Sequence, residues 1–322
     1  MTTRINQLDP ELSVIVCAYN IDGFIGACLD SILAQKVDFQ LEILVGDDGS
    51  TDDTRNIISK YAHEHPDIIT PVFRDKNLGY SANFIDLLER SSGKYFAQVD
   101  GDDFLSDKTK FQTQADILNR NPNVSVCFHH YVDLLETSKT EQAVPSPFEK
   151  DTIVGFEYLL NGPLGPGNTC MVRRSALPSP IPTWVRESAN HMDFSIHALS
   201  ALRGDIYYLN KVMSVYRKHE TNITKVEKSE TLFLKSIMIN EGILNDMINL
   251  GIGTYQNTLR WIINQRKLRL SFHYLDRGMI GRFFRYFIPS ILKIRYWNLR
   301  VLKDSIYQGA PILAGKVKRI VP

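Results

Sequence analysis

The sequence predicts an α/β protein built on a mostly parallel, doubly wound sheet, followed by a helical C-terminal region. Short apolar, β-branched runs alternate with segments of helical periodicity over the first 125 residues, and the connections are short. Such alternation requires a parallel sheet with helices on both faces. From about residue 228 onward the pattern is helical only. We therefore expect a first domain at residues 1–225 and a helical, basic and aromatic region at residues 226–322.

The elements follow in order along the chain. Strands are expected at residues 12–19, 41–45, 69–73, 95–99, 168–174 and 206–216, and helices at 24–34, 81–90, 108–120 and 193–202. Ser50 or Thr51 is expected to cap another helix, with Asp52 and Asp53 in its first turn. In open parallel sheets ligands bind beyond the carboxyl ends of the strands. The loops after residues 19, 46 and 100 should therefore converge on one crevice.

Composition restricts the class of protein. The 322 residues are 43% hydrophobic and 23% charged, which is typical of a globular chain, and the four cysteines lack metal-ligand spacing. The first residues contain no apolar run, and no stretch of eighteen apolar residues occurs anywhere. We therefore expect neither a signal peptide nor a spanning helix, and a cytoplasmic protein with free thiols.

A cluster of carboxylates follows the strand expected at residues 95–99. Asp100, Asp102 and Asp103 stand within one short turn, where like charges repel unless a cation neutralises them. Carboxylate oxygens at a strand end suit Mg²⁺ or Mn²⁺, which keeps open positions for phosphate oxygens. A solvated acidic turn is the alternative, because Asp and Gly are common turn residues.

A second acidic turn, residues 46–52, follows the strand expected at residues 41–45. The carboxylate of Asp48 could accept hydrogen bonds from a ribose hydroxyl or a base N–H. Helix capping is the alternative for this turn, although Asp48, which precedes Gly49, is harder to explain in that way.

Together these segments resemble the ordered signatures of glycosyltransferase family 2. The segments are residues 13–20 (SVIVCAYN), 46–52 (GDDGSTD) and 100–103 (DGDD), and residues 77–83 (NLGYSAN) are similar to the N-x-G loop of that family. The resemblance covers about residues 12–220. It implies a GT-A fold and an enzyme that moves a sugar from a nucleotide diphosphate with inversion of the anomeric centre.

The resemblance also implies roles for individual residues. Tyr19 would pack on the base, Asp48 would contact the base, and Cys17 would line the nucleoside pocket. Asp100 and Asp102 would span the diphosphate and the metal, with Asp103 as the candidate direct metal ligand. Which of these three carboxylates holds the ion varies within the family, so all three stay candidates. UDP is the nucleotide expected on family grounds, with GDP and dTDP open.

An inverting transfer needs a general base to deprotonate the acceptor hydroxyl. The family usually has an acidic pair at the start of a helix, whereas this chain has His191-Met192-Asp193 and lacks the Glu. We place the base at Asp193. Because a helix N-terminus lowers the pKa of an aspartate, a purely structural first-turn charge is the alternative. His191, whose ordinary pKa is nearer neutral, is the other candidate base.

Residues 216–222 (YRKHETN) resemble a further signature of the family. His219 would complete the metal shell, and Arg217 or Lys218 would neutralise the departing diphosphate. A basic surface loop is the alternative. Residues 165–169 (GPGNT) are expected either to shape the acceptor side or to form a simple turn.

The region from residue 266 to residue 319 is basic and aromatic, with no spanning run. This mixture is typical of helices that lie in a membrane interface, which would bring the enzyme to lipid-linked acceptors at the inner face of the membrane. Packing on the catalytic domain and homodimer formation are the alternatives, and no motif supports nucleic-acid binding. The predicted function is a Mn²⁺- or Mg²⁺-dependent transfer of a hexosyl or N-acetylhexosaminyl group to a glycan or lipid-linked acceptor in cell-surface polysaccharide synthesis.

Two other functions stay open. A sugar nucleotidyltransferase would need a Gly-rich loop with Lys or Arg after the first strand, which residues 19–23 (YNIDG) do not provide. A catalytically inactive glycan- or nucleotide-binding relative would bind nucleotide without transfer.

Overall fold

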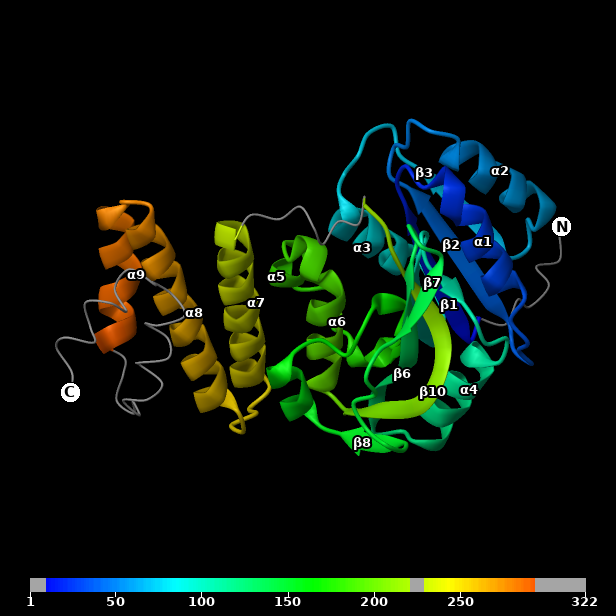
Figure 1. The fold of residues 1–322 in the computed structure, drawn as a ribbon. Coiled ribbons are helices and arrows are strands. Elements are labelled where there is room, and N and C mark those ends of the chain that lie inside the picture. The colour runs from blue at the N-terminus through cyan, green and yellow to red at the C-terminus, as the bar shows by residue number, and fades with distance from the viewer. Residues whose placement is uncertain (1–9, 221–228, 293–322) are drawn as a thin grey trace, which may run out of the picture. The chain divides into compact units, whose positions relative to one another are not determined.

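The structure is a computed structural model that describes residues 10–220 and 229–292. The chain divides into two compact units, residues 1–222 and residues 223–322. Each unit is described by itself below, and Figure 1 shows their elements.

One continuous sheet organises the N-terminal unit. Its strands, in spatial order, are β3 (Ile69–Phe73), β2 (Leu41–Asp47), β1 (Leu12–Ala18), β4 (Tyr95–Asp100), β9 (Cys170–Arg173), β6 (Val124–Leu135), β10 (Asp205–Lys218) and β5 (Phe104–Leu105). At the margins, β7 (Thr140–Ala143) pairs with β6, and β8 (Thr152–Val154) pairs with β10. Strands β1 to β4 are parallel to their neighbours among themselves, and β9 is antiparallel to both of its neighbours. The predicted α/β class with a mostly parallel central sheet is confirmed.

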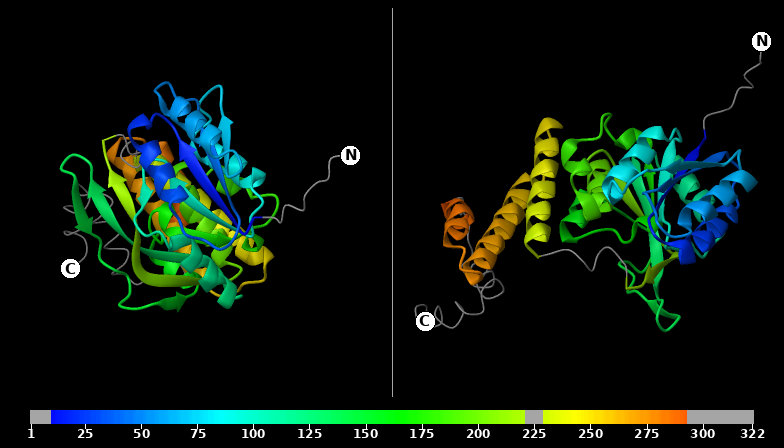
Figure 2. Two further views of the ribbon diagram at one scale, coloured as in Figure 1. Left: turned by 90° about the vertical axis from the view of Figure 1, so that its right-hand side faces the viewer. Right: turned by 90° about the horizontal axis from the view of Figure 1, so that it is seen from above.

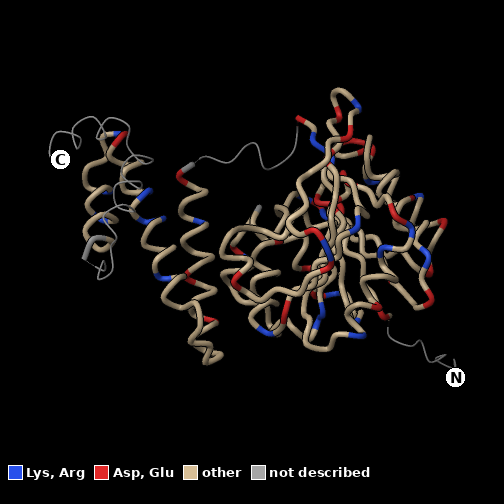
Figure 3. The backbone as a smooth tube through the Cα atoms, turned by 60° about the horizontal axis from the view of Figure 1, so that its bottom comes forward, with Lys and Arg blue, Asp and Glu red and all other residues tan. Residues whose placement is uncertain are grey.

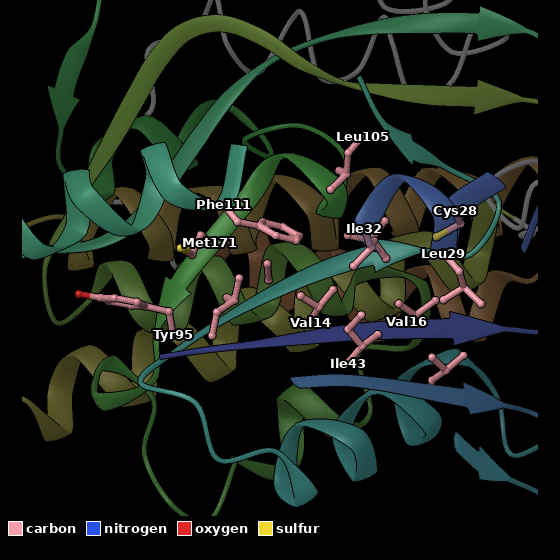
Figure 4. Packing of buried hydrophobic residues seen from close by; sticks show 14 of the residues in the cluster. Val14, Val16, Cys28, Leu29, Ile32, Ile43, Tyr95, Leu105, Phe111 and Met171 are labelled. Carbon is pink, nitrogen blue, oxygen red and sulfur yellow. The ribbon is translucent and has the colours of Figure 1, made fainter. Parts of the chain in front are cut away.

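Helices cover both faces of this sheet (Figures 1 and 2). One layer contains α1 (Asp22–Leu33), α2 (Thr54–Glu64) and α4 (Lys110–Arg120), whose apolar residues share one core with β1. Val14 and Val16 point into that core, as Figure 4 shows, while Ile15 between them is equally buried but outside it. The other layer contains α3 (Tyr80–Arg90), which packs on β1 and β2, and α6 (Met192–Ala201), which packs on β6 and β9. Burial from both sides explains why β1 is continuously apolar.

Short helical turns connect β8 to α6. They are η1 (Phe156–Asn161), η2 (Gly167–Thr169), η3 (Arg174–Ala176), α5 (Thr183–Arg186) and η4 (Ala189–His191). The strand predicted at residues 168–174 is therefore shorter, because its first residues form η2. The predicted elements at 69–73, 81–90 and 193–202 match β3, α3 and α6 to within one residue.

The predicted cap of the second helix is wrong. The helix begins only at Thr54, because the preceding loop is held by other contacts. The backbone N–H of Asn20 donates to Ser50 Oγ, and the backbone N–H of Thr51 donates to Asn20 Oδ1. The carboxylate of Asp52 then accepts a hydrogen bond from the Thr54 N–H. This loop is thus tied to the end of β1 and not wound into the helix.

The C-terminal unit contains three described helices, α7 (Ser229–Asn249), α8 (Gln256–Asp276) and α9 (Ile280–Leu292). They share an apolar core that includes Ile237, Leu268, Phe272 and Phe283. None of the described helices has both the length and the apolar character needed to cross a membrane.

Candidate active site

The parallel pairing of β1, β2 and β4 brings their carboxyl ends side by side. In register, Cys17 lies opposite Gly46 of β2 on one side and opposite Asp100 of β4 on the other. The three segments that were separate in the sequence therefore meet at one edge of the sheet, as the strand–helix alternation predicts.

Both carboxylates at the end of β2 are buried and held by fixed donors. Asp47 accepts hydrogen bonds from Arg55 Nε at 2.8 Å and from the Ser50 N–H at 3.1 Å. Asp48 accepts the N–H groups of Leu78 and Gly79 at 2.8 and 2.9 Å, one on each oxygen. Asp48 therefore fixes the loop that leads into α3. A hydrogen bond from a bound nucleobase to Asp48 would have to use the remaining lone pairs of the Asp48 carboxylate oxygens.

At the end of β4, Asp100 shares a hydroxyl with Asp193. The hydroxyl of Tyr80 lies 2.9 Å from Asp100 Oδ1 and 3.2 Å from Asp193 Oδ1. Gln98 Nε2 donates to Asp100 Oδ1 at 3.1 Å and also contacts the Tyr80 hydroxyl. Asp100 of β4, which is expected on the side of the nucleotide, and Asp193 of α6, the predicted general base, thus belong to one hydrogen-bond network.

Burial changes the protonation of this pair. Burial, with the charges of Asp193 and Asp102, raises the pKa of Asp100 to about 8. Burial also raises the pKa of Asp193 above its ordinary value. The expectation that a helix N-terminus lowers the pKa of Asp193 is wrong, because the loss of solvent outweighs the helix dipole. A raised pKa is what a carboxylate needs to take a proton near neutral pH.

Asp102 pairs with His219, a residue far along the chain. The two atoms Asp102 Oδ2 and His219 Nε2 are 2.9 Å apart, and the imidazole stacks on Phe24 with ring centroids 4.9 Å apart. The Asp102 side chain keeps 23% of its surface exposed, whereas the His219 side chain keeps 8%. Two adjacent ligands about 2.1 Å from an octahedral Mg²⁺ would lie about 3 Å apart. The separation therefore fits a shared divalent cation as well as a hydrogen bond.

Asp103 has a different environment from Asp102. It is 1% exposed; its Oδ1 accepts the backbone N–H of Arg217 at 2.8 Å, and its Oδ2 accepts Asn168 Nδ2 at 2.9 Å. Burial, followed by the charges of Asp102 and Asp100, raises the pKa of Asp103. Asp103 thus joins the β4 turn to β10 and to η2. Within the described residues no group of three or more His, Cys, Asp or Glu side chains has the arrangement of a metal site.

The two cations of the 216–222 segment are paired with carboxylates. Arg217 Nη1 lies 3.1 Å from Glu136 Oε2, and its guanidinium stacks over the rings of Phe24 and Phe104. Lys218 Nζ lies 2.5 Å from Asp133 Oδ2. The last residues of this segment, Thr221 and Asn222, lie outside the described residues.

The remaining nucleoside-side residues differ in exposure. Tyr19 stands directly after β1 with 46% of its surface exposed, so its ring is accessible. Cys17 is buried; burial, and then the charges of Asp100, Asp193 and Asp48, raise the pKa of its thiol. The thiol therefore stays neutral among the carboxylates.

Sequence reasoning missed several residues of this site. Gln98 could have been noticed, because it is a polar residue within the apolar run of β4. Tyr80 and Asn168 belong to the segments 77–83 and 165–169, for which the sequence predicted no role of either residue. Glu136, the partner of Arg217, had no signal, because its contact spans 81 positions of the chain.

The comparisons with known proteins agree with this geometry. Residues 13–178 match the family described as glycosyl transferase family 2. The chain belongs to glycosyltransferase family 2. The predicted GT-A fold is confirmed.

Two curated relatives extend the comparison. An uncharacterized protein of Mycobacterium tuberculosis strain H37Rv is 33% identical over 213 residues, which are 66% of this chain and 60% of that protein. The chondroitin synthase of Escherichia coli is 38% identical over 96 residues, which are 30% of this chain and 14% of that protein. The match with the first relatives thus spans 60% of their own length.

Two solved structures share the fold. S. aureus TarS residues 1–349, in complex with UDP-GlcNAc, has a TM-score of 0.59 and 18% identity, with 93% of this chain and 81% of that chain covered. The mannosyltransferase PcManGT from Pyrobaculum calidifontis, in complex with GDP-Man and Mn²⁺, has a TM-score of 0.52 and 16% identity, with 92% and 78% covered.

Proposed function

We propose that this glycosyltransferase moves a sugar from a UDP-linked donor to a glycan or lipid-linked acceptor, with inversion, in cell-surface polysaccharide synthesis. The observation that carries the proposal is the Tyr80 hydroxyl, which links the predicted base, Asp193, to the donor-side carboxylate Asp100. The UDP-GlcNAc complex of TarS supports a UDP donor, and the match with a chondroitin synthase supports a polysaccharide product.

The nucleoside would lie over the carboxyl ends of β1 and β2. The exposed ring of Tyr19 offers a stacking surface for a base, and the neutral thiol of Cys17 can line the pocket without repelling it. Asp48 would accept the base N–H with a lone pair that Leu78 and Gly79 leave open.

Asp102 and His219 would hold Mn²⁺ or Mg²⁺ together with diphosphate oxygens and water. A divalent ion there supplies positive charge that stabilises the departing diphosphate. The carboxylate oxygen of Asp102 suits Mn²⁺, and an imidazole is a common metal ligand in general. The Mn²⁺ complex of PcManGT supports the assignment. We assign Asp103 to support of the turn, because both of its oxygens already accept hydrogen bonds from the protein.

Arg217 would support the diphosphate side indirectly. Its backbone N–H holds Asp103, and its guanidinium is paired with Glu136. The diphosphate charge would then be met mainly by the cation at Asp102 and His219.

Asp193 would act as the general base. As the acceptor hydroxyl oxygen forms its bond to the anomeric carbon, the bond from that carbon to the diphosphate oxygen breaks, and the hydroxyl proton passes to Asp193. Its raised pKa suits this role. His191 stays the other candidate.

The test is Asp193→Asn, measured against wild type with a panel of nucleotide sugars and Mn²⁺. We expect UDP affinity to stay within about twofold, whereas the transfer rate falls by about 10²–10⁴-fold, the usual cost of losing a general base. Near-normal turnover in the variant would move the base role to His191. Nucleotide binding by wild type without hydrolysis or transfer of any donor would contradict the proposed function and favour an inactive relative.

We also propose that the C-terminal unit contacts the inner face of the membrane. Along α9, Ile280, Phe284 and Ile288 recur every fourth residue and are each about half exposed, with Arg282 and Arg285 beside them. Figure 3 shows the basic positions of this unit in blue. The mixture is suited to anionic headgroups and the acyl boundary. The basic and aromatic residues from 293 onward lie outside the described residues.

Flotation with anionic and neutral vesicles tests this contact. We expect Phe284→Ser with Ile288→Ser to reduce binding to anionic vesicles, whereas Trp261→Ser, at a similarly exposed aromatic position of α8, changes it little. These surface changes are preferable to truncation at Asp276, which would remove Phe283 from the helical core. Wild type that stays unbound beside anionic vesicles at low salt would contradict the proposal, and loss of a dimer in the variant would identify a dimer surface.

A further inference from the structure

The first turn of α3 connects the donor side of the site to the acceptor side. Just before it, the N–H groups of Leu78 and Gly79 are held by Asp48. Within it, Asn83 Nδ2 donates to the Gly46 carbonyl of β2 at 2.8 Å, and Ser81 Oγ donates to the Ala189 carbonyl of η4 at 2.6 Å. The turn therefore has a fixed position relative to β2 and to the loop that leads into α6.

Tyr80 extends from this turn into the centre of the site. Its hydroxyl is a hydrogen-bond neighbour of Asp100, Asp193 and Gln98, which belong to β4 and α6. Because Gln98 Nε2 donates to the hydroxyl oxygen, the single hydroxyl hydrogen is left for the carboxylates. One hydrogen can be donated to only one of the two carboxyl groups at a time, so the hydroxyl links Asp100 and Asp193 without satisfying both of them.

Gln98 is itself held in place. It is 6% exposed, and a Cβ atom added at Gly167 would lie 2.2 Å from Gln98 Nε2. A residue with a side chain at 167 would displace the amide from the Tyr80 hydroxyl. Because Gly167 has no side chain, η2 can lie close to the Gln98 amide and limit the orientations that this amide can take.

We propose that Tyr80 is a positioning residue for the transfer step, which holds the carboxylate of Asp193 in a fixed geometry relative to Asp100. Helix α3 would then fix the position of the loop held by Asp48, on the nucleotide side, relative to Asp193, on the acceptor side. The inference rests on the proposed function, since it takes Asp193 to be the base.

The experiment compares wild type, Tyr80→Phe and Tyr61→Phe in the full chain. Tyr61 is the matched control: its hydroxyl also bonds an aspartate, Asp30, at 2.7 Å, but on α1 away from this network. We expect Tyr80→Phe to lower kcat by about 10–100-fold, the scale that a displaced catalytic group costs, with UDP affinity within about threefold. Tyr61→Phe should leave both quantities near wild type.

The pH profile of kcat separates positioning from a general loss of structure. Within the part of the chain that the structure describes, the titratable groups that interact with Asp193 are Tyr80 of α3, Asp100 of β4, Cys17 of β1 and Cys170 of β9. The Tyr80 hydroxyl favours the ionised carboxylate, so its removal should move the acidic limb of the profile to higher pH. Tyr61→Phe should not move it.

A second variant covers the case in which Tyr80→Phe does not fold. Gln98→Met removes the amide that orients the hydroxyl and should lower kcat in the same direction with the same retention of UDP binding. If Tyr80→Phe, or Gln98→Met where the first is unfolded, keeps wild-type kcat and its pH profile, the inference is overturned while the proposed function stands. If wild type shows no transfer, the proposed function itself fails.

Discussion

The two acidic turns of the N-terminal unit have similar sequences and different environments. At the end of β2, Asp47 and Asp48 are neutralised by an arginine and by backbone N–H groups. At the end of β4, Asp100 contacts the Tyr80 hydroxyl and the Gln98 amide, and Asp102 faces the imidazole of His219. The fixed donors of Asp47 and Asp48 fit a structural turn, whereas the partly exposed Asp102 fits the cation site that we propose.

The β4 turn contains both kinds of carboxylate. Asp103 resembles the β2 turn, because both of its oxygens accept hydrogen bonds from the protein and it is buried. Asp102, one position earlier, is partly exposed and faces His219. If this distinction is correct, substitution of Asp102 should mainly lower activity, whereas substitution of Asp103 should mainly lower stability.

The largest expected effect is on activity, at Asp102. Asp102→Asn should lower the metal-dependent turnover by about 10²–10³-fold, because the charge that balances the transition state loses its protein ligand. The melting temperature should change by no more than a few degrees, since this side chain is partly exposed. Donor turnover with Mn²⁺ and thermal unfolding measure the two effects. Retained turnover would show that the cation is held elsewhere.

The next effect is on stability, at Asp103. Asp103→Asn places an amide N–H₂ group against one of two protein donors, and a buried mismatch of this kind costs about 1–3 kcal/mol. Urea unfolding followed by circular dichroism measures the free energy of unfolding. An unchanged unfolding free energy with abolished metal-dependent UDP binding would show that Asp103 is a metal ligand after all.

The third effect is on the pH dependence of stability in the metal-free protein. The pKa of Asp100 is about 8 in the folded chain and near 3.8 when unfolded, so the folded state binds more protons between these values. Stability should therefore fall as pH rises from about 4 to 8. In Asp100→Asn this contribution is absent, and the decline of the melting temperature should be shallower by a few degrees. Parallel curves for the two proteins would contradict the raised pKa.

The smallest effect is expected in the β2 turn. Asp47→Asn breaks a pair with Arg55 whose guanidinium side chain is 40% exposed, so the cost should be about 1–2 kcal/mol. UDP affinity with Mn²⁺ should not change, which calorimetry can verify. A clear loss of metal-dependent binding would remove the contrast between the two turns.

Much of this architecture was predictable, because the apolar runs of β1, β2, β3 and β4 are local signals. Strands β6 and β7 were not predicted. His129, His130 and Tyr131 interrupt the apolar pattern of β6, and the exposed β7 has no apolar face. The acidic and histidine residues of the site stand in short motifs and could be named in advance.

The partners of those residues could not be predicted. The approach of His219 to Asp102 across 117 positions was expected only from the family resemblance. Tyr80 meets Asp193 across 113 positions, and no local pattern specifies such a contact. The direction of the Asp193 pKa shift was predicted wrongly for the same reason. The helix dipole can be inferred from the sequence, whereas the burial of Asp193 appears only in the fold.

The most direct test of the central claim is titration calorimetry of UDP in the presence of Mn²⁺ or of a chelator. If Asp102 and His219 hold the cation that binds the diphosphate, wild type and Asp47→Asn should bind UDP at least about tenfold more tightly with Mn²⁺, the scale of one good charge-assisted contact. Asp102→Asn should gain little or nothing from the metal. Equal UDP affinity of wild type with and without Mn²⁺, or a full metal-dependent gain in Asp102→Asn, would contradict the account.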